Sequence, residues 1–222
     1  INDAPVVVGN LTDEDLWRPE NDSGRVYGPT RVREALTFSR NLVSIRVLQQ
    51  LGVRKLVEMA ARVGFDVNDM QPNLTLALGT HAYTPLEVAS GYTAIANGGF
   101  KVEPWLIDRI EDVDGNIIYE VDPVIACSAC ERQVSDDEFL EASRIEDLLQ
   151  DPEPEFREAP RSIDERVTYV LTSMLEDVIQ RGTGRRARVL ERNDLAGKTG
   201  TTNGPRDAWF SGCLLYTSDA AD

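Results

Sequence analysis

Histidine, cysteine and lysine are all scarce: the 222 residues contain one histidine, three cysteines and three lysines. A zinc site needs four ligands, and His81 lies far from Cys127 and Cys130 in the sequence, so we expect neither a metal nor a cofactor. The two cysteines form a C-x-x-C. For such a pair a local disulfide is favoured in an oxidising compartment, and free thiols are the alternative.

Long apolar runs and basic clusters are also missing. No run of eighteen apolar residues occurs, and the first residues lack the basic start and apolar core of a signal peptide. The net charge of −15 argues against a nucleic-acid partner, because phosphate binding needs clustered lysine and arginine. Residues 131–158 hold eleven acidic and three basic residues. We interpret them as a solvated surface segment, or alternatively as a contact for a partner or accessory domain.

The composition is that of a globular protein, 41% hydrophobic and 27% charged, and the length suits one large domain or one domain with an insertion. Apolar periodicity and end signals predict helices over 30–36, 43–52, 53–64, 84–99 and 163–184. Thr84, Pro85 and Glu87 predict a capped helix start. A hairpin is expected over 104–121, with its turn at Asp114-Gly115, and neighbouring strands over 194–202 and 206–212. Together these elements predict an α/β (α+β) fold in which helices flank an antiparallel sheet.

Two short motifs have the residue types of an acyl-transfer site. In "FSRN", Ser39 and Asn41 would point about 200° apart on a regular helix, so they converge only if the chain leaves the helix there and restarts near Leu42. The alternative is that Asn41 caps the restarting helix. In "LAGKTGTT", Lys198 stands among small residues, where a ligand or another backbone can approach closely. Its alternative role is a charge on an exposed edge strand.

In this order the motifs resemble the signature of the penicillin-binding proteins and serine β-lactamases, Ser-x-x-Lys, Ser-x-Asn and Lys-Thr-Gly. Longer stretches, "YGPTRVREALTFSRNLVSIRVLQQLG", "LALGTHAYTPLEVASGYTAIANGG", "QRGTGRRA" and "LAGKTGTTNGPRDAWFSG", resemble the transpeptidase domain of class A, bifunctional penicillin-binding proteins of the Gram-negative 1A type. The resemblance covers most of residues 1–212 and weakens between about 121 and 161.

The first of the three motifs is absent. Leu195, Gly52 and Gly98 stand three residues before the three lysines, so no Ser-x-x-Lys occurs. We expect the nucleophilic serine and its lysine base to precede Ile1, and the fragment alone to be inactive. The last ten residues, "CLLYTSDAAD", match a translated sequencing adapter. The expected organisation is therefore an incomplete transpeptidase domain over 1–120 and 161–212, an acidic insertion or linker over 121–160, and the adapter over 213–222.

The resemblance implies a D,D-transpeptidase that cross-links peptidoglycan stem peptides through a serine acyl-enzyme. Ser39 would relay a proton to the leaving amine, Asn41 would bind the substrate backbone, and Lys198 would supply positive charge. The expected substrate-binding residues are Thr199, Gly200, Thr201 and Thr202. Strand alternation alone places Lys198, Gly200 and Thr202 on one face and Thr199 and Thr201 on the other.

The resemblance also implies partners and a location. The partners are stem peptides, lipid-linked glycan strands and β-lactams, with protein activators or a homodimer as further candidates. The location is the periplasmic face of the bacterial inner membrane, in a membrane-anchored parent with a glycosyltransferase domain. Alternatives with the same motifs are a D,D-carboxypeptidase, a β-lactamase and a non-catalytic penicillin-sensing domain.

Overall fold

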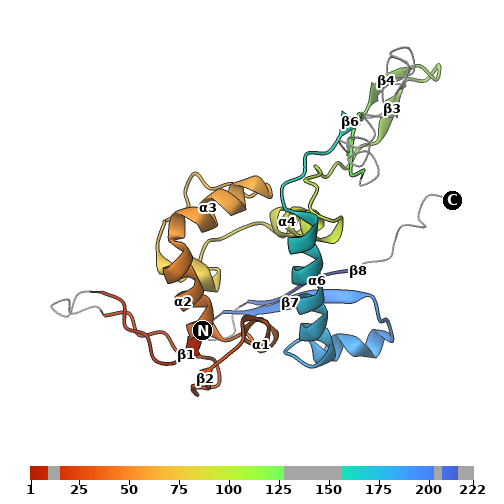
Figure 1. The fold of residues 1–222 in the computed structure, drawn as a ribbon. Coiled ribbons are helices and arrows are strands. Elements are labelled where there is room, and N and C mark those ends of the chain that lie inside the picture. The colour runs from red at the N-terminus through yellow and green to blue at the C-terminus, as the bar shows by residue number, and fades with distance from the viewer. Residues whose placement is uncertain (10–15, 128–156, 203–206, 215–222) are drawn as a thin grey trace, which may run out of the picture.

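The structure is a computed structural model that describes residues 1–9, 16–127, 157–202 and 207–214. Helices, a two-stranded sheet beside them and a projecting hairpin make up its architecture (Figure 1). The helices are α1 (Val32–Thr37), α2 (Asn41–Leu51), α3 (Val53–Arg62), α4 (Pro85–Ala96) and α6 (Glu165–Gln180), with 3-10 helices η1 (Leu74–Leu78) and η4 (Arg185–Leu190). The predicted mixed fold is confirmed, and the two 3-10 helices were not predicted.

All five predicted helices are present, and the clearest end signals lie at the start of α4 and the end of α2. Thr84 forms a full capping box with Glu87 at the start of α4, and Pro85 is its first residue. Gly52 ends α2 with φ +86°, a conformation that glycine adopts without steric cost. Helix α6 runs from Glu165 to Gln180 and is shorter at both ends than the predicted span of 163–184.

Strands β7 (Leu195–Thr201) and β8 (Ala208–Leu214) form the sheet that carries the K-T-G motif. They pair antiparallel, with Lys198 opposite Ser211 and Gly200 opposite Trp209. Helix α6 packs on β7 and α4 packs on β8, so the sheet lies against the helices through the buried end of β7, Leu195 and Ala196. The Lys198 backbone is thereby fixed relative to α6.

The predicted hairpin is present, and its turn is longer than expected. Strands β3 (Arg109–Glu111) and β4 (Ile117–Glu120) are antiparallel, and the residues between them turn around the Asp112 carboxylate, which accepts the N–H groups of Asp114 and Asn116. Gly115 supplies the positive φ of +84°. The alternating apolar residues do not form a buried face here, and every residue of both strands is exposed.

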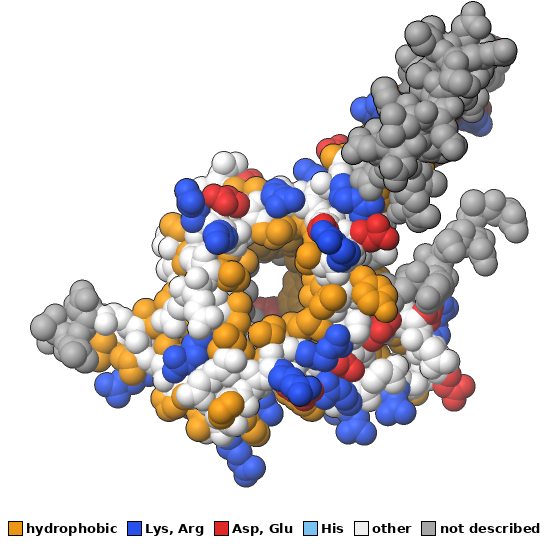
Figure 2. Space-filling view, viewed as in Figure 1, with side chains coloured by type: hydrophobic (Ala, Val, Ile, Leu, Met, Phe, Trp, Pro, Cys, Tyr) orange, Lys and Arg blue, Asp and Glu red, His pale blue; other side chains and the backbone are white. Residues whose placement is uncertain are grey.

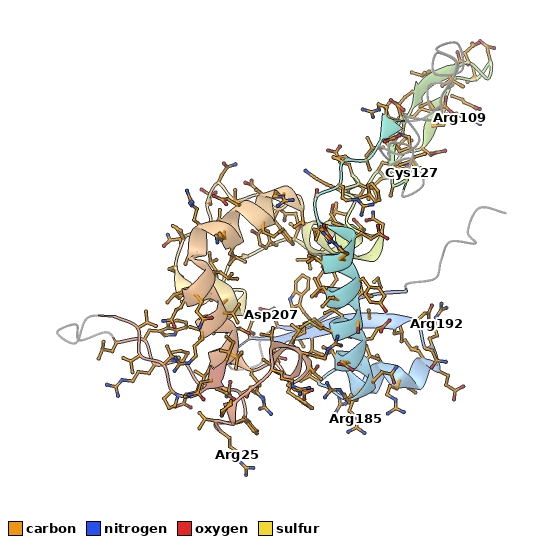
Figure 3. All side chains as sticks on the ribbon, in the orientation of Figure 1. Arg25, Arg109, Cys127, Arg185, Arg192 and Asp207 are labelled. Carbon is orange, nitrogen blue, oxygen red and sulfur yellow. The ribbon has the colours of Figure 1, made fainter. Side chains whose placement is uncertain are left out.

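The hairpin and a short parallel pair, β5 (Val124–Ile125) with β6 (Arg157–Glu158), project away from the helices (Figure 1). Cys127 lies on this projection, as does Arg109 (Figure 3). Cys127 is disulfide-bonded, as predicted. Cys213 is a free thiol. Cys130 and nearly all of the acidic stretch lie outside the described residues.

The N-terminal segment before α1 contains two short strands. Strand β1 (Asn2–Asp3) pairs antiparallel with β2 (Gly28–Pro29). Val6 is buried with Leu42 and Ile45 of α2, and Trp17 packs against this cluster. The N-terminal segment is thus anchored on α2. In the described part of the chain, no helix combines the length and apolar character needed to cross a membrane.

Candidate active site

Ser39 lies in a tight bend between two helices. Helix α1 ends at Thr37 and α2 begins at Asn41, so the chain leaves the helix and restarts as the motif requires. Ser39 has φ +52°, a left-handed conformation that few non-glycine residues adopt. Its own N–H donates to Leu36 O, and the Arg40 N–H donates to Ala35 O, so the end of α1 holds the bend.

The alternative role of Asn41 as a helix cap is wrong. Arg40 occupies the cap position without a side-chain bond, and Asn41 is the first helical residue. The Asn41 amide instead donates to Glu20 O at 2.9 Å. The first turn of α2 is capped from a distance, because the Leu42 N–H donates to Asn21 Oδ1 at 3.3 Å.

Lys198 meets Ser39 although 159 residues separate them in sequence. Its Nζ donates to Ser39 Oγ at 3.0 Å and to the carbonyl oxygen of Thr199 at 2.8 Å. Because a serine hydroxyl can donate one hydrogen bond while accepting another, Ser39 keeps its own proton for a second partner. Burial lowers the pKa of Lys198, since removing water disfavours the charged form. The two motif residues therefore form one contact.

Thr183, in a third segment for which no role was predicted, bonds to neighbours of both residues. Its N–H donates to Thr37 O at 3.3 Å, and its hydroxyl lies 2.6 Å from that of Thr199. A Cβ on Gly182 would lie 2.2 Å from Thr37 O, so only glycine lets the chain pass this close to the end of α1. The glycines on either side of Thr183 were the available signal, because they indicate a tight backbone approach.

Ion pairs hold α1 against α6 beside the bend. Arg181 donates to both Glu34 oxygens, at 2.9 and 2.5 Å, and to Asp177 at 3.1 Å. Arg33 donates to Asp177 at 3.0 Å. The hydrogen bonds from Arg181 are the largest cause of the lowered pKa of Glu34 and of Asp177. Exposed pairs each contribute little, and this connected network fixes the orientation of α1.

The remaining predicted residues follow Lys198 along β7. Gly200 is exposed, and a Cβ added there would meet only the Trp209 Cβ, at 3.5 Å. Thr201 is exposed and pairs with Ala208. The Thr202 hydroxyl accepts the N–H of Asp207 at 2.9 Å, and Asp207 directly precedes β8 (Figure 3). The Thr202 side chain is therefore engaged in closing the hairpin.

An apolar hollow opens between α1, α2, α3 and α6, near the bend. It has a volume of about 500 Å³, and Figure 2 shows hydrophobic side chains around the opening. Its lining is apolar apart from two residues, Ser44 and Lys55, and includes Leu36, Val43 and Met174. Neither this hollow nor the cavity of about 530 Å³ beside the projecting hairpin is lined by Ser39, Asn41 or Lys198.

Comparison with known proteins identifies the family. The penicillin binding protein transpeptidase domain matches residues 9–208. The chain belongs to this family. Penicillin-binding protein 1A of Pseudomonas aeruginosa is 43% identical over 99% of the chain, and that of Neisseria lactamica is 37% identical over 96%. The chain spans 28% and 23% of those relatives, so it corresponds to a part of much longer proteins.

Solved structures of penicillin-binding proteins share the fold. Penicillin-binding protein 1A of Haemophilus influenzae matches with a TM-score of 0.80 and 30% identity, over 96% of this chain and 32% of that one. The D,D-transpeptidase domain of a peptidoglycan glycosyltransferase from Eggerthella lenta has a TM-score of 0.64 and 20% identity, over 96% of this chain and 50% of that one. The second likeness concerns the fold alone. The predicted fold class is confirmed.

Proposed function

We propose that this chain forms two walls of the acyl-transfer cleft of a peptidoglycan D,D-transpeptidase, and that the nucleophilic serine comes from a segment outside the 222 residues. One observation carries the proposal: the hydrogen bond of 3.0 Å between Lys198 Nζ and Ser39 Oγ. It joins the second and third motifs of the serine acyltransferase signature in the way that a shared proton-transfer site requires.

Ser39 acts as the proton relay. Lys198 donates to its oxygen, which leaves the Ser39 O–H free to donate to the nitrogen of the leaving group. When the external serine attacks the carbonyl of the penultimate D-alanine, the new C–O bond forms and the C–N bond to the terminal D-alanine breaks. The departing amine takes the proton of Ser39, which regains one from the nucleophile through its lysine base. An amine of a second stem then displaces the serine and forms the cross-link.

The strand after Lys198 binds the substrate. The Lys198 ammonium attracts the terminal carboxylate, and the Thr199 and Thr201 hydroxyls are donors of the matching type. The exposed Gly200 leaves room for an extended peptide beside the strand. The N–H of Thr201, with that of the nucleophile, forms the oxyanion hole, where each donor contributes about 3 kcal/mol to transition-state stabilisation. Asn41 binds the substrate backbone through its amide.

The segment that carries the nucleophile packs into the apolar hollow. Exposed apolar surface of this extent marks a contact site, and this hollow includes Val32, Ala35 and Leu36 of α1, the helix that ends beside Ser39. The relatives are more than three times as long as the matched region, which leaves ample chain to fill it. No Ser-x-x-Lys occurs in the sequence itself.

The same assignment gives the setting of the whole protein. Its substrates are stem peptides on lipid-linked glycan strands, and β-lactams acylate the same serine because their strained amide mimics the D-alanyl-D-alanine end. The protein acts at the periplasmic face of the inner membrane, anchored there and joined to a glycosyltransferase domain. Protein activators or a second copy are its candidate partners.

Fluorescent penicillin tests the proposal directly. We compare the 222-residue chain with an extended protein, meaning this chain together with the upstream segment that carries Ser-x-x-Lys. We expect covalent labelling of the extended protein alone, and its loss when the serine of that motif is replaced by alanine. Labelling of any serine within the 222 residues would contradict the proposed division of the site.

A further inference from the structure

The start of α2 accepts support from two residues about 20 positions upstream in the sequence, through hydrogen bonds. Glu20 offers its carbonyl oxygen to the Asn41 amide at 2.9 Å, and Asn21 offers its side-chain oxygen to the Leu42 N–H at 3.3 Å. The consecutive residues Glu20 and Asn21 thus bind the first two residues of α2, directly after the Ser39 bend. Helix α2 lacks a cap from its own sequence, so Asn21 satisfies an N–H that its flanking residues leave open.

Asn21 is itself fixed by a buried carboxylate. Its Nδ2 donates to the two oxygens of Asp3, at 2.8 and 3.1 Å, and to Arg25 O at 2.7 Å. Asp3 is fully buried and Asn21 is 4% exposed. Because a carboxylate only accepts hydrogen bonds from an amide, the NH₂ group must face Asp3, and the amide oxygen must face α2. The position of Asp3 is set by the pairing of β1 with β2, in which Asp3 lies opposite Gly28.

The bend needs such a support on its downstream side. The end of α1 holds its upstream side through hydrogen bonds to Leu36 and Ala35, and Ser39 keeps an unfavourable φ of +52°. If the Leu42 N–H lost its partner, the first turn of α2 could shift, and Ser39 could relax into a more common conformation. Its hydroxyl would then leave Lys198, and the Asn41 amide would turn with it.

We propose that Asn21 is a positioning residue for Ser39 and Asn41, and that Asp3 sets the orientation of the Asn21 amide. Neither residue touches the substrate; both act through the first turn of α2. This inference rests on the proposed function, because it assigns the bend a place in acyl transfer.

The experiment measures the second-order rate constant of acylation by fluorescent penicillin, together with thermal stability, in the extended protein. The variants are Asn21→Ala, Asp3→Ala and Asp3→Asn. The matched control is Asp164→Ala, since Asp164 accepts the N–H of Arg166, the second residue of α6, as Asn21 accepts that of the second residue of α2. All rate constants are measured at temperatures where each variant is folded.

We expect Asn21→Ala to lower the rate constant about 10- to 100-fold, because small displacements of catalytic groups have effects of this size. The control should stay within about twofold, as its lost cap lies away from the reacting groups. Asp3→Asn retains an oxygen that accepts from Asn21, so it should recover most of the rate lost in Asp3→Ala. This recovery separates positioning from a general loss of structure.

Ser39→Ala and Lys198→Met are measured in the same series to separate the two proposals. If these two variants are slow while Asn21→Ala matches the control, the positioning role is overturned and the proposed function stands. If both keep the wild-type rate constant, the proposed function fails and the positioning role fails with it. Should Asn21→Ala not fold, hydrogen exchange of the Leu42 amide in Asp3→Asn and Asp3→Ala decides. Faster exchange in Asp3→Ala alone supports the role, and equal exchange overturns it.

Discussion

Replacing Lys198 by methionine separates the effect of its ammonium group on stability from its proposed effect on catalysis. The Nζ donates to Ser39 Oγ at 3.0 Å and to Thr199 O at 2.8 Å. Hydrogen bonds from a charged group contribute about 1.5–3 kcal/mol each. The desolvation that lowers the Lys198 pKa opposes this gain. Methionine keeps an apolar stem of similar length, so the free energy of unfolding should change by no more than about 2 kcal/mol in either direction.

The rate of acylation should respond far more strongly. Without the ammonium, the Ser39 hydroxyl loses the donor that orients it, and in the proposed site the substrate carboxylate loses its positive partner. Removal of one preorganised donor typically lowers a rate about 10²–10³-fold, and we expect Lys198→Met to fall in this range in the extended protein. Fluorescent penicillin gives the rate constant, and denaturant unfolding gives the stability of the same samples.

The pH dependence of stability supplies an internal check. Burial places the folded-state pKa of Lys198 below its unfolded value of about 10.4. Between the two values the unfolded state binds more protons than the folded state, so the free energy of unfolding rises with pH in that window. Below the folded-state pKa the desolvation cost is present in full. Lys198→Met should therefore lack this rise, which unfolding curves at several alkaline pH values would detect.

Two results would refute the reasoning. An acylation rate constant within about threefold of wild type would show that Lys198 is an edge charge with no catalytic role. A loss of more than about 4 kcal/mol in stability would show that the ammonium holds the domain together, and the rate effect would then follow from unfolding. The double variant with Ser39→Ala should be no slower than the slower single variant, because residues that act as a unit are not additive.

Three further sets of variants test the neighbouring backbone. Ser39→Gly should be more stable than Ser39→Ala by about 1 kcal/mol in thermal unfolding, since only glycine adopts a φ of +52° freely. Both variants should lose the proposed proton relay. Equal stability of the two would contradict backbone strain at Ser39. Gly182→Ala should lower the free energy of unfolding by about 1–3 kcal/mol and slow acylation, because its Cβ would lie 2.2 Å from Thr37 O, two residues before Ser39. The milder control is Gly184→Ala, whose nearest neighbour is a side-chain methyl of Ile179 at 2.9 Å, and equal losses from the two would argue against the close approach. On β7, Gly200→Ala should change stability by less than about 0.5 kcal/mol and still reduce acylation, whereas Gly197→Ala should destabilise the hairpin, since its Cβ would lie 2.8 Å from Ser211 O; unchanged acylation in Gly200→Ala would remove the strand edge from the substrate site.

Local signals predicted the elements whose determinants are local. The capping box of Thr84 and Glu87 and the glycine at position 52 depend on residues within one turn, so sequence alone placed these helix ends. The pairing of β7 with β8 was likewise predicted from two short segments that are close in sequence. Alternation in the 104–121 hairpin correctly indicated strands but not burial, because the residues of β3 and β4 are all exposed.

The site depends on contacts that no local pattern contains. Ser39 and Lys198 are 159 residues apart, and only the order of the family motifs suggested that they meet. Asn41 has the residue type of a cap, yet tertiary contacts place the cap function on Asn21 and turn the Asn41 amide to Glu20. Thr183 reaches Thr199 because α6 ends beside β7. The glycines around Thr183 indicate a close backbone approach, but they do not identify Thr199 as the partner.

The bend also shows where this chain tolerates unfavourable geometry. Within the described residues, Ser39 and Glu191 are the non-glycine residues with positive φ. Glu191 ends the 3-10 helix η4, where a left-handed residue is a common terminator. Ser39 likewise follows a helix end, because its N–H donates to Leu36 O and the Arg40 N–H donates to Ala35 O, the hydrogen bonds of a left-handed helix terminator. Glycine is the usual residue at such a position, and the serine here brings a hydroxyl to a lysine whose charge is disfavoured by burial. A serine where glycine is usual and a lysine disfavoured by burial thus meet in one hydrogen bond, a combination that is expected at a functional site. The Ser39–Lys198 contact is therefore a better guide to the active site than either hollow in the described part of the chain.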